Sequence, residues 1–309
     1  MKKSIFLSLI LITFLVPVFH VKSEAITVAE IVIQLQFQDA RSFSDGLAAV
    51  KSDGMCGYID RLGQWIIPPT YNFPIGDFSS GLAFVGNQFL DKNGARAFEG
   101  AKFENARSFK PKGEKALAAV QLSGQWGFID LNGELVISPK YDNAGDFSES
   151  SDGLYLAPVK VGGVWGYVDS KGRELIMSKF DYAWNFSGSF AAVMIEGAVG
   201  YIDRTGLYTI DPRFVHGGAF HNGRAPVRIG DKTGYINDKG RLLIPAKFHD
   251  GGEFNNGLAP VATDNRWGYI NVDGNIVLPP LYDKALPFSE GLAAVEQDGL
   301  WGYIAYKNF

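Results

Sequence analysis

Short stretches of alternating apolar and polar residues fill most of the chain and recur at a fixed distance. They follow three patterns, "LAAV", "WGYID" and "ELVI", which are rich in β-forming residues and separated by turns that contain glycine. The glycine of the second pattern falls at Gly57, Gly127, Gly166, Gly200, Gly234, Gly268 and Gly302. The last four steps are 34 residues each, a period typical of a tandem array of one small supersecondary unit.

Eight aromatic landmarks divide the array into units. They are Phe43, Phe78, Phe109, Phe147, Phe186, Phe220, Phe254 and Phe288. The predicted units cover residues 43–77, 78–108, 109–146, 147–185, 186–219, 220–253, 254–287 and 288–309. In the second turn of most units an Asp or Asn stands first and a glycine fourth, which fits a type I turn with a G1 bulge. We therefore expect three antiparallel strands per unit.

The joints between units are expected to be irregular. The third strand ends in sequences such as "IPPTY", where proline cannot donate to the ladder. The segment that follows, such as "YDNAGDF", is interpreted as a helical or irregular turn. Residues 30–37 match the third strand at residues 134–141, so the chain opens with an extra third strand and stops after a second one. The expected fold is an all-β open superhelical array of about eight units, the alternative being a closed propeller-like ring.

The first residues are predicted to be a signal peptide. Lys2 and Lys3 precede a charge-free run over residues 5–19, and small residues before position 24 provide a cleavage site, which places the signal peptide at residues 1–23. The run is short for a membrane span, although an uncleaved anchor is the alternative. The array then occupies residues 24–309, and the expected location is the periplasm or the outside of the cell.

Net charge, apolar runs and cysteine content exclude several kinds of partner and structure. Cleavage after Ser23 removes three lysines, so 26 basic residues remain against 33 acidic ones and the net charge is about −7. This acidic balance argues against a nucleic acid partner, which needs a basic face. The chain has no second long apolar run, so no integral membrane span is predicted after the signal peptide. Cys56 is the single cysteine, so no internal disulfide can form.

The repeat resembles the WG-repeat family of bacterial tandem β-repeats. The shared pattern, "F-S-x-G-L-A-x-V" followed by "G-x-W-G-Y-I-D-x-x-G-x-x-V-I-P-P-x-Y", is nearly intact from Phe288 to Ile304 and again from Phe109 to Tyr141. The resemblance implies a binding or scaffolding array without shared catalytic residues. The chain departs from the pattern where Cys56, Val199 and Thr233 replace the tryptophan, and in the shortened second unit.

The repeated aromatic residues allow two interpretations. Along a strand the Trp and Tyr of "WGYID" point to one face and the Gly and Ile to the other. The rows could be exposed and stack sugar rings, but replacement by Cys, Val and Thr favours a packed structural core. The signature residues are Trp126, Gly127, Phe128, Trp165, Gly166, Tyr167, Gly200, Tyr201, Gly234, Tyr235, Trp267, Gly268, Tyr269, Trp301, Gly302 and Tyr303.

Catalytic and metal-binding patterns are weak. The Asp column that includes Asp60 and Asp130 is explained by the turns, because calcium needs six or more converging oxygens. His216, His221 and His249 lack paired metal-ligand spacing, and no nucleophile motif is present. We therefore predict no catalytic residue, no cofactor and no metal.

The predicted function is non-catalytic binding of a macromolecule, with another protein as the expected partner. Two insertions in adjacent units break the repeat, and inserted loops often carry the binding site. The candidate residues are Lys110, Lys112, Lys115, Ser148, Asp152 and Tyr155. The alternative is a lectin-like module that binds cell-wall or surface glycan through the aromatic rows.

Overall fold

The computed structural model describes residues 29–149 and 153–306, and the signal peptide predicted over residues 1–23 lies outside them. Among these residues no helix occurs that could cross a membrane. The elements assigned to them are β-strands. In chain order they are β1 Glu30–Phe37, β2 Asp39–Ala40, β3 Leu47–Ser52, β4 Met55–Asp60, β5 Trp65–Tyr71, β6 Leu82–Val85, β7 Gln88–Asp91, β8 Asn105–Ala106, β9 Ala118–Leu122, β10 Gln125–Ile129, β11 Leu135–Tyr141, β12 Asn143–Ala144, β13 Ser148–Glu149, β14 Tyr155–Val161, β15 Val164–Asp169, β16 Glu174–Phe180, β17 Tyr182–Ala183, β18 Ala191–Ile195, β19 Ala198–Ile202, β20 Tyr208–Phe214, β21 His216–Gly217, β22 Ala225–Ile229, β23 Lys232–Ile236, β24 Leu242–Phe248, β25 Asp250–Gly251, β26 Leu258–Thr263, β27 Arg266–Asn271, β28 Ile276–Tyr282, β29 Lys284–Ala285, β30 Leu292–Gln297 and β31 Leu300–Ala305.

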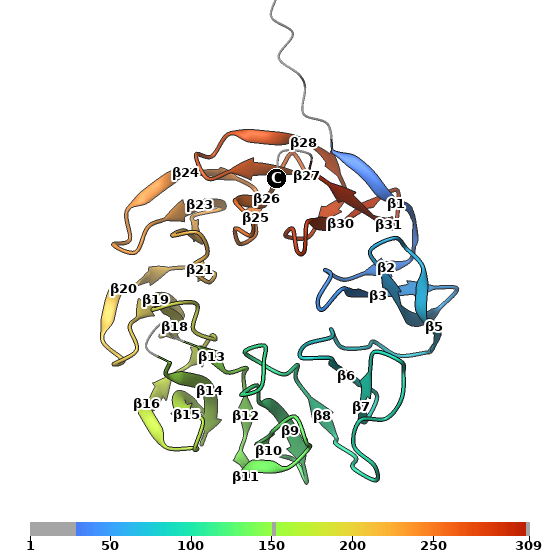
Figure 1. The fold of residues 1–309 in the computed structure, drawn as a ribbon. Coiled ribbons are helices and arrows are strands. Elements are labelled where there is room, and N and C mark those ends of the chain that lie inside the picture. Colours follow the sequence, from blue (N-terminus) through green and yellow to red (C-terminus); the bar gives the residue numbers. More distant parts are fainter. Residues whose placement is uncertain (1–28, 150–152, 307–309) are drawn as a thin grey trace, which may run out of the picture.

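The strands form a closed β-propeller, with small antiparallel sheets arranged around a central axis (Figure 1). Within the described residues, seven sheets have four or five strands. We number these full blades 1 (β2–β5), 3 (β8–β11), 4 (β12–β16), 5 (β17–β20), 6 (β21–β24), 7 (β25–β28) and 8 (β29–β31 with β1). Between blades 1 and 3, β6 and β7 form a two-stranded sheet, the reduced blade 2.

Strands from the two ends of the array close the ring within one sheet. β1 pairs antiparallel with β31, with Glu30 opposite Ala305, so blade 8 takes its outer strand from the start of the array (Figure 1). This pairing covers an edge of β31 that would otherwise present free N–H and C=O groups. The all-β tandem architecture is confirmed. The open superhelical array is wrong, and the closed ring is the correct alternative.

Each full blade contains a short strand that the sequence did not predict. It is two residues long and lies next to the axis; β2, for example, pairs with β3, with Ala40 opposite Val50. The segment expected to be helical or irregular therefore begins each blade as its innermost strand, and blades have four strands rather than three. The turn that follows has φ of 54° at Asp45 and 81° at Gly46, the positive values of a type I′ hairpin.

The Asx turns between the third and fourth strands have the geometry that their sequence indicates. Asp60 Oδ1 accepts hydrogen bonds from the backbone N–H of Leu62 at 2.9 Å and of Gln64 at 2.8 Å. The glycine at the fourth position of these turns also lies against the preceding blade, as in the Asn271 turn of blade 7. A Cβ at Gly274 would lie 2.8 Å from Ile244 Cγ2, so the absent side chain leaves room for the neighbouring outer strand.

The glycine of the Trp-Gly pair lies against the outer strand of its own blade. The register between β10 and β11 shifts between Trp126 and Phe128, where the outer strand bulges. A Cβ at Gly127 would lie 2.5 Å from the Ile137 carbonyl oxygen and 2.7 Å from Pro139 N. The glycine therefore serves packing inside a blade, not contact between blades. Equally close approaches recur at Gly57, Gly166, Gly200, Gly234, Gly268 and Gly302.

Pairs of aromatic rings join neighbouring blades around the ring. In each pair the aromatic residue that follows the glycine position packs on the landmark phenylalanine of the next blade, with ring centroids 4.7–5.1 Å apart. Such pairs contribute about 0.5–1.5 kcal/mol beyond burial. They are Tyr58–Phe78, Phe89–Phe109, Phe128–Phe147, Tyr167–Phe186, Tyr201–Phe220, Tyr235–Phe254, Tyr269–Phe288 and Tyr303–Phe43. The last pair spans the closure, and the second shows that the reduced blade keeps this contact.

Candidate functional site

The aromatic signature residues lie in the core. Trp126, Trp165 and Trp301 are at most 7 % exposed, and Trp267 is half-buried. Buried rings follow them at Phe128, Tyr167, Tyr201, Tyr235, Tyr269 and Tyr303. Val199 and Thr233, which replace the tryptophan, are buried as well. These rows are not available to stack sugar rings, so the glycan alternative loses the surface that it required.

The tyrosine hydroxyls of the signature connect blades 1, 4, 5, 6, 7 and 8 to the blade that follows each of them. Tyr167 Oη donates to the Trp184 carbonyl at 2.7 Å, and Tyr303 Oη donates to the Arg41 carbonyl at 2.8 Å across the closure. Burial raises the pKa of these hydroxyls, because the charged form is not solvated there. Equivalent bonds are made by Tyr58, Tyr201, Tyr235 and Tyr269.

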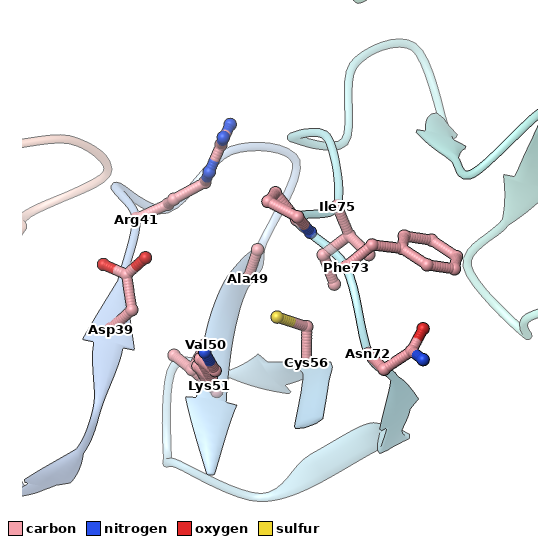
Figure 2. A pocket seen from close by; sticks show the side chains of 10 residues that line it. Asp39, Arg41, Ala49, Val50, Lys51, Cys56, Asn72, Phe73 and Ile75 are labelled. Carbon is pink, nitrogen blue, oxygen red and sulfur yellow. The ribbon is translucent and has the colours of Figure 1, made fainter. Parts of the chain in front are cut away.

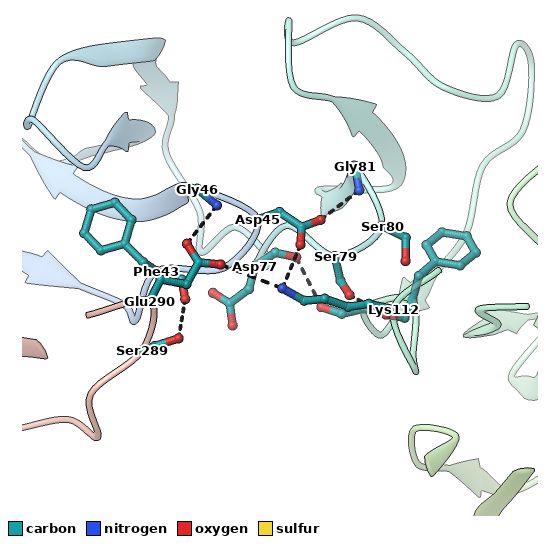
Figure 3. A network of polar contacts seen from close by, with 12 residues as sticks. Phe43, Asp45, Gly46, Asp77, Ser79, Ser80, Gly81, Lys112, Ser289 and Glu290 are labelled. Atoms are coloured by element: carbon teal, nitrogen blue, oxygen red, sulfur yellow. Dashed lines mark hydrogen bonds and ion pairs between the residues drawn. The ribbon is translucent and has the colours of Figure 1, made fainter. Parts of the chain in front are cut away.

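The first inserted loop turns back onto the protein (Figure 3). Lys112 Nζ lies 2.7 Å from Asp45 Oδ1 in blade 1 and 3.8 Å from Glu290 Oε1 in blade 8. Lys112 therefore crosses the reduced blade, and its ammonium group is used inside the molecule. Of the other two candidate lysines, Lys110 is half-buried and Lys115 is exposed.

The carboxylates that receive Lys112 also bind neighbouring turns (Figure 3). Glu290 Oε2 accepts from the Gly46 N–H at 3.0 Å, and Asp45 Oδ2 accepts from the Gly81 N–H at 2.8 Å. Burial alone would raise the pKa of the Asp45 carboxyl, but the hydrogen bonds from Lys112 and Gly81 lower it below its ordinary value. The inner turns of blades 8, 1 and 2 are thus joined by one polar network.

The second inserted loop extends a hairpin. β13 pairs with β14, with Ser148 opposite Leu156, so blade 4 gains a fifth strand. Tyr155 is half-buried and packs against the hydrophobic core shared by blades 3 and 4. Asp152, the remaining candidate in this loop, lies outside the described residues. The described part of this insertion therefore has a structural role. The clefts described next were not predicted from the sequence.

The smallest of three clefts near the axis lies between blade 1 and the connector to the reduced blade (Figure 2). It measures about 110 Å³ and brings together Asp39 and Arg41 from the inner edge of blade 1, Cys56 from β4, and Asn72 and Phe73 from the connector. Cys56 is half-buried, and burial raises the pKa of its thiol, which disfavours the reactive thiolate.

The largest cleft adjoins the reduced blade. It measures about 660 Å³, and its polar lining includes Arg41, Asp77, Arg107 and Asp146 from the inner edges of four consecutive blades. Arg41 Nη1 lies 3.4 Å from Asp77 Oδ1, an exposed ion pair. Phe73 contributes an aromatic ring that is 39 % exposed.

The reduced blade explains why this cleft exists. Only two residues separate Val85 from Gln88 there, whereas six separate the equivalent Val50 and Gly57 in blade 1. The shorter hairpin leaves Gly86 in the cleft wall. The missing Trp-Gly pair and the short spacing in the second unit were the sequence signal for this site.

A third cleft of about 390 Å³ continues around the axis to blades 5, 6 and 7. Its lining includes Lys110, Asp146, His221 and Glu253, and His221 Nε2 lies 3.3 Å from Glu253 Oε2. Asp146 also lines the largest cleft, so the two share a wall. Burial raises the pKa of the Asp146 carboxyl, against the opposing charges of Arg107 and Lys110.

Metal-ligating side chains do not gather. His221 faces Glu253, His249 Nδ1 accepts from the Asp264 N–H at 3.2 Å, and the His216 ring lies edge-on to Trp184. Among the described residues, no group of three or more His, Cys, Asp or Glu side chains could hold a metal ion.

The family model for the WG containing repeat matches seven segments of the chain. They are residues 29–56, 57–87, 126–165, 165–197, 200–232, 234–267 and 267–301. The chain belongs to the WG containing repeat family. The stretch between the second and third segments holds much of the reduced blade and the first insertion, where the repeat departs most from its pattern. A search of the curated proteins finds no match.

Solved structures of the same fold have little sequence in common with this WG-repeat protein. A eukaryotic initiation factor is 14 % identical, with a TM-score of 0.55, covering 87 % of this chain and 83 % of its own. The WD40 domain of SCAP from fission yeast is 10 % identical, with a TM-score of 0.49, covering 90 % and 98 %. Streptogramin B lyase is 15 % identical, with a TM-score of 0.48, covering 89 % and 96 %. At such identities the similarity extends to the fold alone.

Proposed function

We propose that this propeller is an exported, non-catalytic scaffold that binds a segment of a partner protein along the clefts near its axis. The observation that supports the proposal most is the cleft of about 660 Å³ beside the reduced blade. It combines guanidinium and carboxylate groups of Arg41, Asp77, Arg107 and Asp146 with the exposed ring of Phe73. Such a mixture suits a polypeptide, which offers backbone amides, charges and apolar side chains together.

The continuity of the clefts favours an extended segment. The first two clefts share Arg41 and Phe73, and the second and third share Asp146. A chain that follows this path touches several blades in turn. Separate weak contacts on one rigid scaffold then add to a useful affinity.

The absence of catalysis is part of the proposal. In the third cleft, Ser187 Oγ donates to the Phe220 carbonyl at 2.6 Å and His221 faces Glu253, so the hydroxyl and the imidazole have different partners. Hydrolysis by a serine needs the two groups to meet. The described contacts therefore favour binding rather than nucleophilic chemistry.

Export rests on the sequence alone. The charge-free run at residues 5–19 and the small residues before position 24 support a Sec-type signal peptide. Expression of the full chain with cell fractionation tests this. We expect a product shortened by 23 residues outside the cytoplasm, and an equal product in the cytoplasm would contradict export.

A site-specific photo-crosslinker in the producing cell tests the binding surface. Placed at Phe73 in the largest cleft, it should give a discrete protein adduct, whereas placed at Leu62, a 76 % exposed turn residue of blade 1, it should not. The adduct should decrease at least fivefold when Arg41→Ala is added and persist with Arg241→Ala, an exposed turn residue of blade 6. Equal adducts at both positions, or no effect of Arg41→Ala, would contradict the placement.

A further inference from the structure

The outer strands of neighbouring blades meet at a recurring aromatic position. Each outer strand of a full blade ends in a Phe or Tyr, and the first residue of the next blade's outer strand can lie against it. At the closure, Trp65 packs edge-on against Phe37 with ring centroids 6.0 Å apart. Between blades 4 and 5, Tyr208 packs against Phe180 in the same way at 6.5 Å. These two rings fill the space between successive outer strands.

The same space is open between blades 3 and 4. The residue equivalent to Trp65 and Tyr208 is Glu174, two positions before the buried Ile176. Its Oε1 turns back to accept hydrogen bonds from Ser178 N and Ser178 Oγ, both at 2.8 Å. A cavity of about 410 Å³ remains, a volume within the range of ligand sites.

The walls of this rim cavity suit an aromatic ring. Val159 and Val168 are buried apolar walls, and Val161 and Met177 are 46 % and 74 % exposed at its edge. Methionine is flexible and polarizable and adapts readily to aromatic partners. Lys140 Nζ lies 5.2 Å from the centre of the Tyr141 ring and completes the lining.

A second observation at the same place is a buried hydroxyl without a hydrogen bond to any described group. The aromatic end of the outer strand is Tyr141 here, Tyr71 and Tyr282 in blades 1 and 7, and Phe at positions 37, 180, 214 and 248. Tyr141 is 4 % exposed, and its hydroxyl makes no hydrogen bond to a described group, unlike those of Tyr71 and Tyr282, which are not among the buried unpaired atoms. The hydroxyl lies at the Gly172 side of the cavity, 3.5 Å from where a Cβ of that glycine would be. A buried polar group without a partner is costly, so its presence calls for a reason.

We propose that this rim cavity receives the side chain of a tryptophan or tyrosine from a partner protein. The incoming ring occupies the space that Trp65 and Tyr208 fill at their own interfaces. Its N–H or O–H donates to the Glu174 carboxylate, and the Tyr141 hydroxyl provides a second polar group at the base. Aromatic anchors in apolar pockets with few polar groups are common binding hot spots. The cavity lies on the outer rim, so this inference does not depend on the clefts near the axis.

Ligand-observed NMR on the mature-length protein tests the inference with N-acetyltryptophanamide as the probe. We expect saturable binding to the wild type and at least tenfold weaker binding of N-acetylleucinamide. Glu174→Tyr places in blade 4 the residue that blade 5 carries and should fill the cavity. It should weaken probe binding at least tenfold while leaving the melting temperature equal or higher. Leu242→Tyr, at the same strand position in blade 6, should bind the probe as the wild type does.

Three results would overturn the inference: no saturable binding to the wild type, equal binding of both probes, or unchanged binding to the Glu174→Tyr variant. Arg41→Ala alters only the clefts near the axis and should leave probe binding unchanged. Loss of the crosslinked adduct with intact probe binding would therefore separate the two proposals.

Discussion

At the scale of single residues, the glycine of the Trp-Gly pair is the most tightly constrained position. Gly127→Val would place a Cβ 2.5 Å from a backbone carbonyl oxygen and 2.7 Å from a proline nitrogen, which cannot move without breaking the bulge. We expect a loss of about 3 kcal/mol or more in the free energy of unfolding by urea. Gln88 occupies the same position in the reduced blade, which has no outer strand. Gln88→Val should therefore change stability by less than about 0.5 kcal/mol. Equal effects of the two substitutions would show that the outer strand is not the reason for the glycine.

Removing the hydroxyls of Tyr141 and Tyr167 should change the free energy of unfolding in opposite directions. Tyr141→Phe removes a buried hydroxyl that has no described partner, so it should stabilise the fold by about 1 kcal/mol. Tyr167→Phe removes a 2.7 Å hydrogen bond to the Trp184 carbonyl and should destabilise the fold by about 1 kcal/mol. Urea unfolding of both variants measures the difference, and a destabilised Tyr141→Phe variant would mean that its hydroxyl has a partner.

At the scale of elements, the Asx turn between β15 and β16 makes the free energy of unfolding depend on pH. Burial alone would raise the pKa of Asp169, but hydrogen bonds from the Arg173 backbone and guanidinium and from the Lys171 N–H lower it below its ordinary value of 3.8. A lowered pKa stabilises the fold above the ordinary value, and this contribution disappears as pH falls through the folded-state pKa. Asn keeps the oxygen that accepts the two backbone bonds, as Asn237 does in blade 6, so Asp169→Asn should cost about 1 kcal/mol or less at pH 7 and at pH 5, with the difference shrinking below pH 4. A difference that does not change between pH 7 and pH 2 would contradict this account.

At the scale of the whole molecule, the ring depends on one pairing between β1 and β31. Removing residues 29–37 would expose the edge of β31 and take away Ile33 and Phe37, each 3 % exposed. Burial of each side chain contributes about 1.5–3 kcal/mol, so the truncated protein should lose several kcal/mol and self-associate through the open edge. Size-exclusion chromatography and thermal melting measure both effects. A synthetic Glu30–Phe37 peptide should restore the elution volume of the intact protein, and the same peptide with Ile33→Asp should not.

The sequence predicted local features of this molecule better than long-range ones. The Asx turns and the third strands depend on a few adjacent residues, and their patterns suffice. The inner strands escaped prediction because two residues such as Asp39 and Ala40 show no periodicity. Ring closure depends on the rotation between successive blades, which no single unit encodes. The contacts of Lys112 with Asp45 and Glu290 join residues 67 and 178 positions apart, so the sequence located the loop but not its inward direction. The rim cavity needs the alignment of Glu174 with Trp65 and Tyr208, which is visible only once the outer strands are superposed.

The pairing of β1 with β31 also has a consequence for biosynthesis. Glu30 and Ala305, which face each other in blade 8, are separated by 275 positions (305 − 30). At typical elongation rates of about 5–20 residues per second, roughly 14 to 55 s pass between the synthesis of these two residues. During that interval β1 has no partner, because the strand that it covers does not yet exist. Closure of the ring therefore follows the synthesis of β31, and a ribosome that stalls before β31 leaves the growing chain without the strand that β1 pairs with in blade 8.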